Sequence, residues 1–337
     1  MAQPPLVVAD GDIATTRLVA RELEAVYPEV EIRTPDTLFG TRFADRPLVI
    51  SRLCHPSFSW LPGYLAERGI RYAYFLDDNF WELTPDVDRH LASFFNHPAV
   101  LATLDGFVRG ASRVIVWSKL LREYLVARFP EADVVLAAPG VDARAIDRLL
   151  AKRTATAEPC GDEVRVGYPT TRRPGVASLL AAIVAHFAAT RGGAVRFEFV
   201  GWMPDELMGA PHVTLFPHVA DYAAYLDLVV SRRWDVGMAP LAGGRFESFK
   251  TDIKYREYGA CRIPGIYSRV PPYSDVVVDG TTGCLVDNDA GAWIAALEAL
   301  VDSARTREDI AVAAHDDVVR HRDLRVTGRR FAELVSA

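Results

Sequence analysis

Short apolar runs alternate with amphipathic segments of helix length along almost the whole chain. In the first half the apolar runs predict strands, and the segments between them predict helices. The predicted strands are residues 6–9, 30–33, 48–51, 71–76, 113–117 and 134–137, and the predicted helices are residues 13–26, 63–68, 87–95, 100–109 and 120–129. Each run by itself could be a piece of helix, and it is the regular spacing that favours strands of a parallel, doubly wound sheet.

The alternation stops at residues 152–163, a polar stretch without periodicity that contains proline and glycine. We expect a linker here, between a first domain at residues 1–151 and a second domain at residues 164–322. The second half predicts strands at residues 164–167, 195–200, 213–216, 236–239, 263–267 and 284–286, and helices at residues 176–189, 220–230, 253–260, 290–300, 307–319 and 326–335. Ligands of such sheets bind at the carboxyl ends of the strands and in the cleft between domains.

The composition of the chain argues against several classes of protein but does not identify its function. The chain has 337 residues and a formal net charge of −6, which argues against a general nucleic-acid-binding protein. Four scattered cysteines without a CxxC pair indicate neither a zinc site nor a disulfide framework. The sequence has no signal-peptide pattern and no apolar run of membrane-spanning length, so we expect a cytoplasmic protein, for which peripheral contact with the inner face of a membrane stays open.

The densest group of motifs lies in residues 234–288. Ala239-Pro240 ends a predicted strand, Lys254 and Glu257 stand on the next predicted helix, and residues 279–283 form a DGTTG turn. This order of motifs resembles the donor-binding core of the retaining GT-B glycosyltransferases, close to glycosyltransferase family 4. The resemblance covers residues 234–288 well and residues 164–337 loosely.

The resemblance implies an α/β fold of two Rossmann-like, doubly wound domains that face each other across a cleft. It implies an enzyme that moves a sugar from a nucleotide-diphosphate donor (UDP-, GDP- or dTDP-linked) to a carbohydrate or lipid-linked glycan acceptor, with retention at the anomeric carbon. It calls for no metal and no further cofactor. The last segment, residues 323–337, is then expected to cross back to the first domain, although an ordinary capping helix of the second domain would have the same pattern.

The physical chemistry of this segment agrees with a nucleotide site. Lys250, Lys254 and Glu257 are spaced by four and three residues, so they share one face if the helix starts early enough to include Lys250. Ammonium groups suit a diphosphate, and a carboxylate suits the hydroxyls of a ribose, the role that the resemblance implies for Glu257. The first glutamate of the family's pattern would fall at Phe249, and Glu247 could replace it. A solvated Lys–Glu face is the simpler alternative.

Further donor-binding candidates follow the strands of the second domain. Gly167 and Thr170 belong to a strand–turn–helix in which Arg172 or Arg173 could bind a pyrophosphate and stabilise the leaving group, unless both are surface arginines. A strand end at Gly201 and Trp202 could stack on a nucleobase, or Trp202 could be a core residue. The remaining candidates are Ser268, Pro272, Tyr273 and Ser274, the last three at a predicted helix start.

The first domain offers candidates for the acceptor side. His55 follows a predicted strand, and the resemblance implies a catalytic histidine near the transferred sugar. Asp77 and Asp78 follow another strand and, with Trp81, resemble a Y-x-x-D-D-x-x-W element of bacterial polysaccharide glycosyltransferases. They could orient acceptor hydroxyls while Trp81 stacks on a sugar, or they could cap a helix and Trp81 could be buried. The triplet at residues 77–79 looks like a D-x-D metal motif, but it lies in the wrong domain for the donor.

Two other functions remain open. An enzyme with the same fold could invert the anomeric carbon or epimerise a nucleotide sugar. A catalytically silent module that binds glycans is the other alternative, and the missing glutamate at Phe249 gives it some weight.

Overall fold

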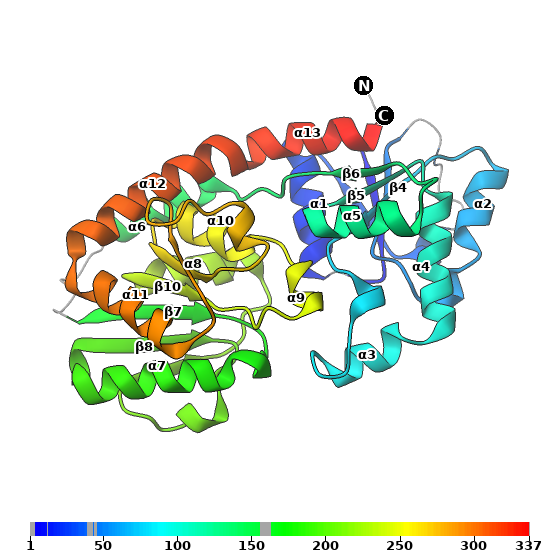
Figure 1. The fold of residues 1–337 in the computed structure, drawn as a ribbon. Helices are drawn as coiled ribbons and strands as arrows, with labels where there is room; N and C mark the ends of the chain where they lie inside the picture. Colours follow the sequence, from blue (N-terminus) through cyan, green and yellow to red (C-terminus); the bar gives the residue numbers. More distant parts are fainter. Residues whose placement is uncertain (1–3, 12, 39–42, 44–45, 156–162, 337) are drawn as a thin grey trace. The chain divides into compact units, whose positions relative to one another are not determined.

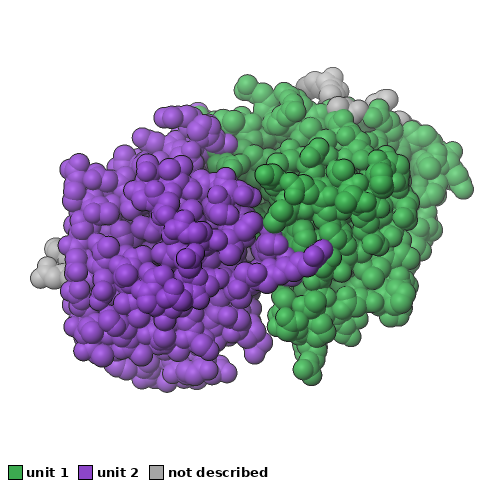
Figure 2. All heavy atoms as spheres, in the orientation of Figure 1, with its two compact units in different colours: residues 1–140, 249–251, 322–337 green, residues 141–248, 252–321 purple. Residues whose placement is uncertain are grey.

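The computed structural model describes residues 4–11, 13–38, 43, 46–155 and 163–336, which form two compact units. Figure 2 shows unit 1 (residues 1–140, 249–251 and 322–337) in green and unit 2 (residues 141–248 and 252–321) in purple. Each unit is an α/β layer structure built around one parallel sheet (Figure 1).

The sheet of unit 1 has the strand order β2-β1-β3-β4-β5-β6, and all neighbours are parallel. The central strands are buried on both faces because helices cover both sides of the sheet. Its strands are β1 (Leu6–Ala9), β2 (Glu31–Arg33), β3 (Leu48–Ser51), β4 (Ala73–Leu76), β5 (Arg113–Val116) and β6 (Val134–Leu136). Its α-helices are α1 (Ala14–Glu24), α2 (Leu61–Glu67), α3 (Arg89–Phe95), α4 (Pro98–Gly110), α5 (Lys119–Arg128) and α13 (Leu324–Ser336).

Unit 2 repeats this design with the strand order β12-β11-β10-β7-β8-β9. Its strands are β7 (Val164–Pro169), β8 (Val195–Val200), β9 (Val213–Phe216), β10 (Val236–Ala239), β11 (Gly265–Ser268) and β12 (Cys284–Val286). Its helices are α6 (Ala143–Ala155), α7 (Ala177–Thr190), α8 (Tyr222–Arg232), α9 (Arg245–Ser248), α10 (Ile253–Ala260), α11 (Ala290–Asp302) and α12 (Ala304–Arg322). Within the described part of the chain, no helix is both long enough and apolar enough to cross a membrane.

The doubly wound architecture expected from the sequence is confirmed, and every predicted strand is present within two residues of its predicted bounds. Besides the single-turn helix α9, one longer helix, α6, was not predicted. It packs into unit 2 through Ile146 and Leu150, so unit 2 already begins at Val141. The expected linker at residues 152–163 starts inside α6, and its residues 156–162 lie outside the described residues. The last helix, α13, is grouped with unit 1.

A buried carboxylate joins the last residue of unit 1 before unit 2 begins to the final helix of the chain, which belongs to unit 1. Glu22 on α1 is 1% exposed and accepts a hydrogen bond from the backbone N–H of Gly140, the last residue of unit 1 before unit 2. Its other oxygen accepts the Thr327 hydroxyl of α13 at 2.7 Å. A Cβ atom at Gly140 would lie 2.2 Å from the Thr327 hydroxyl oxygen, so only glycine fits at this close approach.

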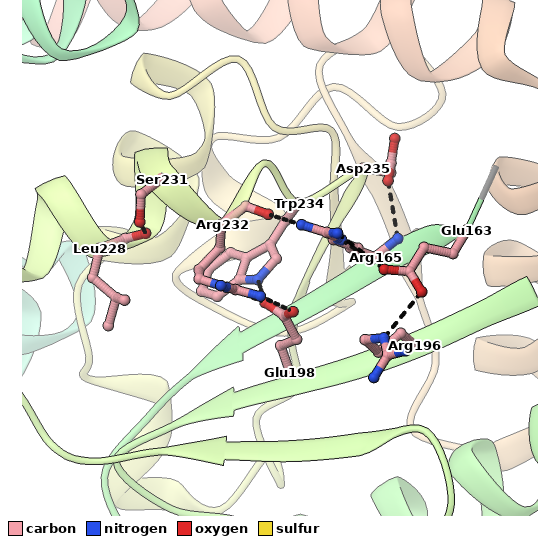
Figure 3. A network of polar contacts seen from close by, with 9 residues as sticks. All are labelled: Glu163, Arg165, Arg196, Glu198, Leu228, Ser231, Arg232, Trp234 and Asp235. Carbon is pink, nitrogen blue, oxygen red and sulfur yellow. Dashed lines mark hydrogen bonds and ion pairs between the residues drawn. The ribbon is translucent and has the colours of Figure 1, made fainter. Parts of the chain in front are cut away.

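A second buried carboxylate lies inside the sheet of unit 2 (Figure 3). Glu198, in the middle of β8, is 1% exposed and accepts hydrogen bonds from the Arg232 guanidinium and from the Trp234 indole N–H, each at 2.8 Å. Trp234 in turn covers Gly167 of β7, where a Cβ atom would lie 1.9 Å from the indole ring. The ion pair and this close contact fix the C-terminal end of α8 against the sheet.

Replacing Glu198 with alanine should therefore destabilise the protein strongly. Breaking a buried ion pair costs about 3–5 kcal/mol, and we expect roughly 3 kcal/mol because Arg232 is partly exposed and can be hydrated. Arg196→Ala is the matched control, because it removes a partly exposed ion pair between Glu163 and a residue of the same strand and should cost less than about 1 kcal/mol. Urea unfolding measures both, and equal losses would show that the buried network does not stabilise unit 2.

Candidate functional site

The carboxyl edge of the unit 2 sheet carries a cluster of three bonded side chains. Lys254 and Glu257 come from α10, and Tyr225 comes from α8. One oxygen of Glu257 accepts hydrogen bonds from the Lys254 ammonium group and from the Tyr225 hydroxyl, each at 2.8 Å. The ammonium group also donates to the Tyr225 oxygen at 2.9 Å. Burial, followed by the nearby carboxylate of Glu257, raises the pKa of Tyr225 well above its ordinary value, so the hydroxyl stays protonated and donates.

Lys250 lies outside this cluster. The helix α10 begins only at Ile253, so the shared helix face that the sequence spacing suggested does not extend to Lys250. Residues 249–251 are grouped with unit 1, where the Lys250 ammonium group pairs with Asp78 at 2.9 Å. In the same unit the ring of Phe249 lies edge-on to Tyr124, with 5.8 Å between ring centroids. Phe249 therefore fills an aromatic contact and brings no carboxylate.

A second charged pair in unit 2 joins the segment after β7 to α9. One Arg173 nitrogen lies 3.5 Å from an oxygen of Glu247. Glu247 is only 8% exposed, and its second oxygen is buried without a hydrogen-bond partner among the described residues. A buried carboxylate oxygen without a donor is costly in a folded protein, so this oxygen is well suited to accept a hydrogen bond from a ligand. Arg172, the neighbour of Arg173, is exposed.

Ser268 holds a loop in place. This fully buried residue at the end of β11 accepts the backbone N–H of Leu241 at 2.8 Å and lies 2.6 Å from the side-chain oxygen of Asn288. The Asn288 amide nitrogen closes the arrangement by donating to the Leu241 carbonyl oxygen at 2.6 Å. The hydroxyl of Ser268 is thus already hydrogen-bonded to the loop that follows β10.

The other donor-binding candidates occupy the ends of neighbouring strands. Thr170 follows β7, and its backbone N–H bonds the carbonyl oxygen at the end of β8, next to Gly201. Trp202 is half-buried and packs against the hydrophobic core. The strand β7 runs two residues further than predicted, so Gly167 lies inside the strand rather than at its end. The short helix η7 (Tyr273–Asp275) follows Pro272, with Tyr273 buried and Ser274 exposed.

Unit 1 has a polar cluster at the carboxyl ends of its central strands. One oxygen of Asp77, after β4, accepts the Thr15 hydroxyl at 2.7 Å and the Arg52 guanidinium at 3.1 Å. Arg52 also donates to Thr15 at 3.0 Å, so the three side chains form a closed ring. Burial raises the pKa of Asp77 above its ordinary value, and the Arg52 charge opposes this.

The residues next to Asp77 differ in their surroundings. Asp78 pairs with Lys250, and Asn79 is fully buried without a hydrogen-bond partner for its amide group among the described residues. Trp81 donates its indole N–H to Asp105 at 2.9 Å, and its ring lies 5.9 Å from that of Phe129. Neither aspartate caps the short helix η3 (Phe80–Glu82), because its N-cap residue is Asn79.

His55 lies in a different part of unit 1. The residue is exposed, its Nδ1 atom accepts the backbone N–H of Ser57 at 3.3 Å, and its ring is stacked on Phe94. In the described part of the chain, no group of three or more histidine, cysteine, aspartate or glutamate side chains is placed to hold a metal ion.

Sequence reasoning missed four residues of these clusters: Thr15, Arg52, Tyr225 and Asn288. Each reaches its cluster from a segment far away along the chain, for example 32 residues between Tyr225 and Glu257. Local spacing cannot reveal such pairs, because only the order of strands in the sheet brings the segments together. The position of Tyr225 on an amphipathic helix after a predicted strand was the one available signal.

Residues 164–303 match the family described as Glycosyl transferases group 1. Over 99% of its length the chain is similar to sucrose-phosphate synthase from Thermosynechococcus elongatus, with a TM-score of 0.69, 15% identity and 98% of that chain covered. HepE from Anabaena, solved with UDP, has a TM-score of 0.70 and 14% identity over 99% of this chain and 100% of its own. Other structures of HepE contain UDP with glucose, or UDP-glucose.

A glycosyltransferase from Rickettsia africae is similar over 100% of this chain and 98% of its own, with a TM-score of 0.63 and 13% identity. No curated protein matches the chain. The two parallel six-stranded sheets and these likenesses show that the chain has the GT-B fold, as the sequence predicted. The family match covers residues 164–303, which form most of unit 2.

The hydrogen bond between Ser268 and the backbone of Leu241 can be tested by amide hydrogen exchange. In Ser268→Ala the Leu241 amide loses its acceptor, so its hydrogen exchange should accelerate about tenfold or more, since one hydrogen bond contributes roughly 1–1.5 kcal/mol. Exposed Ser274 supplies the control variant, Ser274→Ala, which should leave Leu241 exchange unchanged. Unchanged exchange in Ser268→Ala would refute the loop-holding role and favour direct contact with a ligand.

Proposed function

We propose that the protein transfers a sugar from a nucleotide-diphosphate donor to a carbohydrate or lipid-linked glycan acceptor, with retention at the anomeric carbon. The observation that carries this proposal is the bonded cluster of Lys254, Glu257 and Tyr225 at the carboxyl edge of the unit 2 sheet. It lies within the residues that match the group 1 glycosyl transferases. Retention is supported by the resemblance of residues 234–288 to retaining enzymes.

Unit 2 would bind the donor. Glu257, whose carboxylate is held by Lys254 and Tyr225, is the acceptor that we assign to a ribose hydroxyl. The UDP and UDP-glucose bound in the structures of HepE favour a uridine nucleotide over GDP or dTDP. Thr170, Gly201 and Trp202, at the ends of β7 and β8, are proposed to face the nucleotide, and Pro272, Tyr273 and Ser274 to face the diphosphate.

Catalysis would depend on stabilising the departing diphosphate. Lys254 and the arginines after β7, Arg173 and Arg172, are the cations we assign to the negative charge that develops as the glycosidic bond breaks. For Lys250, whose ammonium group is bonded to Asp78, we propose that it orients that carboxylate. No step in this scheme requires a metal ion.

Glu247 is our candidate for the contact to the donor sugar. It stands two residues before Phe249, where the family pattern would have a glutamate, and one of its oxygens is buried without a partner among the described residues. The other oxygen lies close to Arg173, which would hold the carboxylate in one orientation. A hydroxyl of the transferred sugar would supply the missing hydrogen bond.

Unit 1 would bind the acceptor. Asp77 and Asp78 can accept hydrogen bonds from sugar hydroxyls, and the bonds of Asp77 to Thr15 and Arg52 hold it in place. Trp81 would border the same region. We place the enzyme in the cytoplasm, where buried thiols such as Cys54 and Cys261 stay reduced, with acceptors that include glycans at the inner face of a membrane.

Lys254→Ala and Glu257→Ala should each lower kcat/KM for the donor at least tenfold while the fold is retained. The reason is that each removes a charged contact to the nucleotide, worth roughly 1.5–3 kcal/mol. Tyr225→Phe should have a smaller effect in the same direction. Thermal shift with UDP, GDP and dTDP, followed by transfer assays with UDP-glucose, measures these changes.

Lys119→Ala, on α5 of unit 1, and Glu298→Ala, on α11 of unit 2, are the controls, because neither side chain belongs to the cluster and both variants should behave like wild type. Wild-type donor binding and turnover in both Lys254→Ala and Glu257→Ala would overturn the assignment of the nucleotide site.

Glu247→Gln separates the sugar end of the donor from its nucleotide end. A carboxylate that contacts the sugar contributes to the binding of UDP-glucose but not of UDP, so the variant should weaken UDP-glucose about tenfold and UDP much less. Titration calorimetry with both ligands measures the difference, and Glu206→Gln, on the exposed helix η6 (Asp205–Leu207), is the control. Equal weakening of both ligands would mean that Glu247 acts only through Arg173.

A further inference from the structure

A pocket of about 470 Å³ opens in unit 1 where α3 and the start of α4 meet the loop after β3. Three histidines line it together with an exposed aromatic ring, and the lining residues are His55, Pro56, His90, Ser93, Phe94, His97 and Val100. Its volume lies within the range of roughly 300–1,000 Å³ that is usual for small-molecule sites. The polar cluster around Asp77 does not contribute to its lining.

Two of the histidines are held in the same way. His55 and His97 each precede a proline that begins a helix, and each Nδ1 atom accepts the backbone N–H two residues further on, at 3.3 Å from Ser57 and 3.2 Å from Ala99. An imidazole that accepts through Nδ1 is neutral and carries its proton on Nε2. Both rings therefore present an N–H donor from the nitrogen that remains.

The same geometry argues against two other ligands. A metal ion bound through Nε2 would need a lone pair there, and the proton would have to move to Nδ1 and break the cap bond. An anion would find no lysine or arginine among the described residues that line the pocket. The first amide groups of α4 are also already occupied, since Ala99 and Val100 donate to His97.

The apolar part of the pocket is aromatic. Phe94 is 38% exposed, and its ring is stacked on that of His55, with 6.2 Å between centroids and 20° between planes. The electron-rich face of an aromatic ring attracts the weakly positive C–H groups of a saturated ring. A pyranose is a neutral ligand with a face of C–H groups and several hydroxyl groups around its edge. It can stack on the aromatic ring and accept hydrogen bonds from the imidazole N–H groups at the same time.

We propose that this pocket is a binding site for one neutral sugar ring of a glycan, which stacks on Phe94 and accepts hydrogen bonds from His55 and His97. The proposal rests on the proposed glycosyl transfer only for the identity of that glycan as the acceptor. It gives His55 a role in binding sugar rather than in the chemical step. The pocket would hold a sugar unit other than the one whose hydroxyl reacts.

The test is an NMR titration of the full-length protein with isotope-labelled histidine. The imidazole signals are assigned with His55→Gln, His90→Gln and His97→Gln, and the ¹⁵N shifts report the tautomer of each ring. Methyl α-glucoside, methyl α-galactoside, methyl α-mannoside and inorganic phosphate are then titrated separately. We expect Nε2-protonated rings at His55 and His97, and saturable shifts of the lining histidines with at least one glycoside.

Phe94→Ala should weaken that titration about tenfold, whereas Leu91→Ala, an exposed residue of the same helix that does not line the pocket, should leave it unchanged. The proposal is overturned if no glycoside shifts these signals, if Phe94→Ala titrates like wild type, if phosphate saturates the site in place of the glycosides, or if the two rings carry their protons on Nδ1.

This outcome is separate from that of the proposed function. The titration needs no nucleotide, so the pocket can fail while the wild-type protein still binds UDP and UDP-glucose. Conversely, a protein that binds glycosides here but no nucleotide sugar would overturn the proposed function and keep the sugar site.

Discussion

A strand that is buried on both faces of a parallel sheet cannot leave a charged side chain uncompensated, and this constraint arranges the polar chemistry of both units. The central strands of each sheet are apolar and covered by helices. Among the described strand residues, Glu198 is the one charged residue that is fully buried, and it is held by Arg232 and Trp234. The other charged clusters lie beyond the strand ends, where Asp77 and Arg173 can meet partners from several segments.

The burial of strands on both faces of each sheet also explains which elements could be predicted from the sequence. Buried strands such as Leu6–Ala9 and Val236–Ala239 are continuous runs without a polar side chain, so their bounds could be predicted directly from the sequence. The helix α6 was missed although Ile146, Leu149 and Leu150 have helical spacing. Its polar C-terminal half merges into a stretch that looked like a linker, and only the packing of its apolar face against unit 2 determines where it belongs.

Some contacts of the candidate site could likewise be predicted from the sequence, and others could not. Lys254 and Glu257 are three residues apart on one helix, so their pairing could be predicted from spacing alone. The partners that fix their geometry, such as Tyr225, come from other elements and depend on the strand order. For Lys250 the prediction from spacing was wrong. It assumed that the helix starts early enough to include Lys250, but α10 begins at Ile253. Three residues of coil were enough to move its ammonium group to Asp78.

The two hydrogen bonds of Glu22, to Gly140 and to Thr327, bear on how a chain of two units can exchange one unit for another. Because one carboxylate binds both Gly140 and Thr327, the segment that forms unit 2 leaves unit 1 and rejoins it at neighbouring points, and in this sense unit 2 is an insertion into unit 1. An inserted module whose two ends are close together can be exchanged for another without tearing the host sheet. Recombination at these two points would therefore combine one unit 1 with a different unit 2, provided that Glu22 and its two partners are inherited together and that residues 249–251 still fit unit 1.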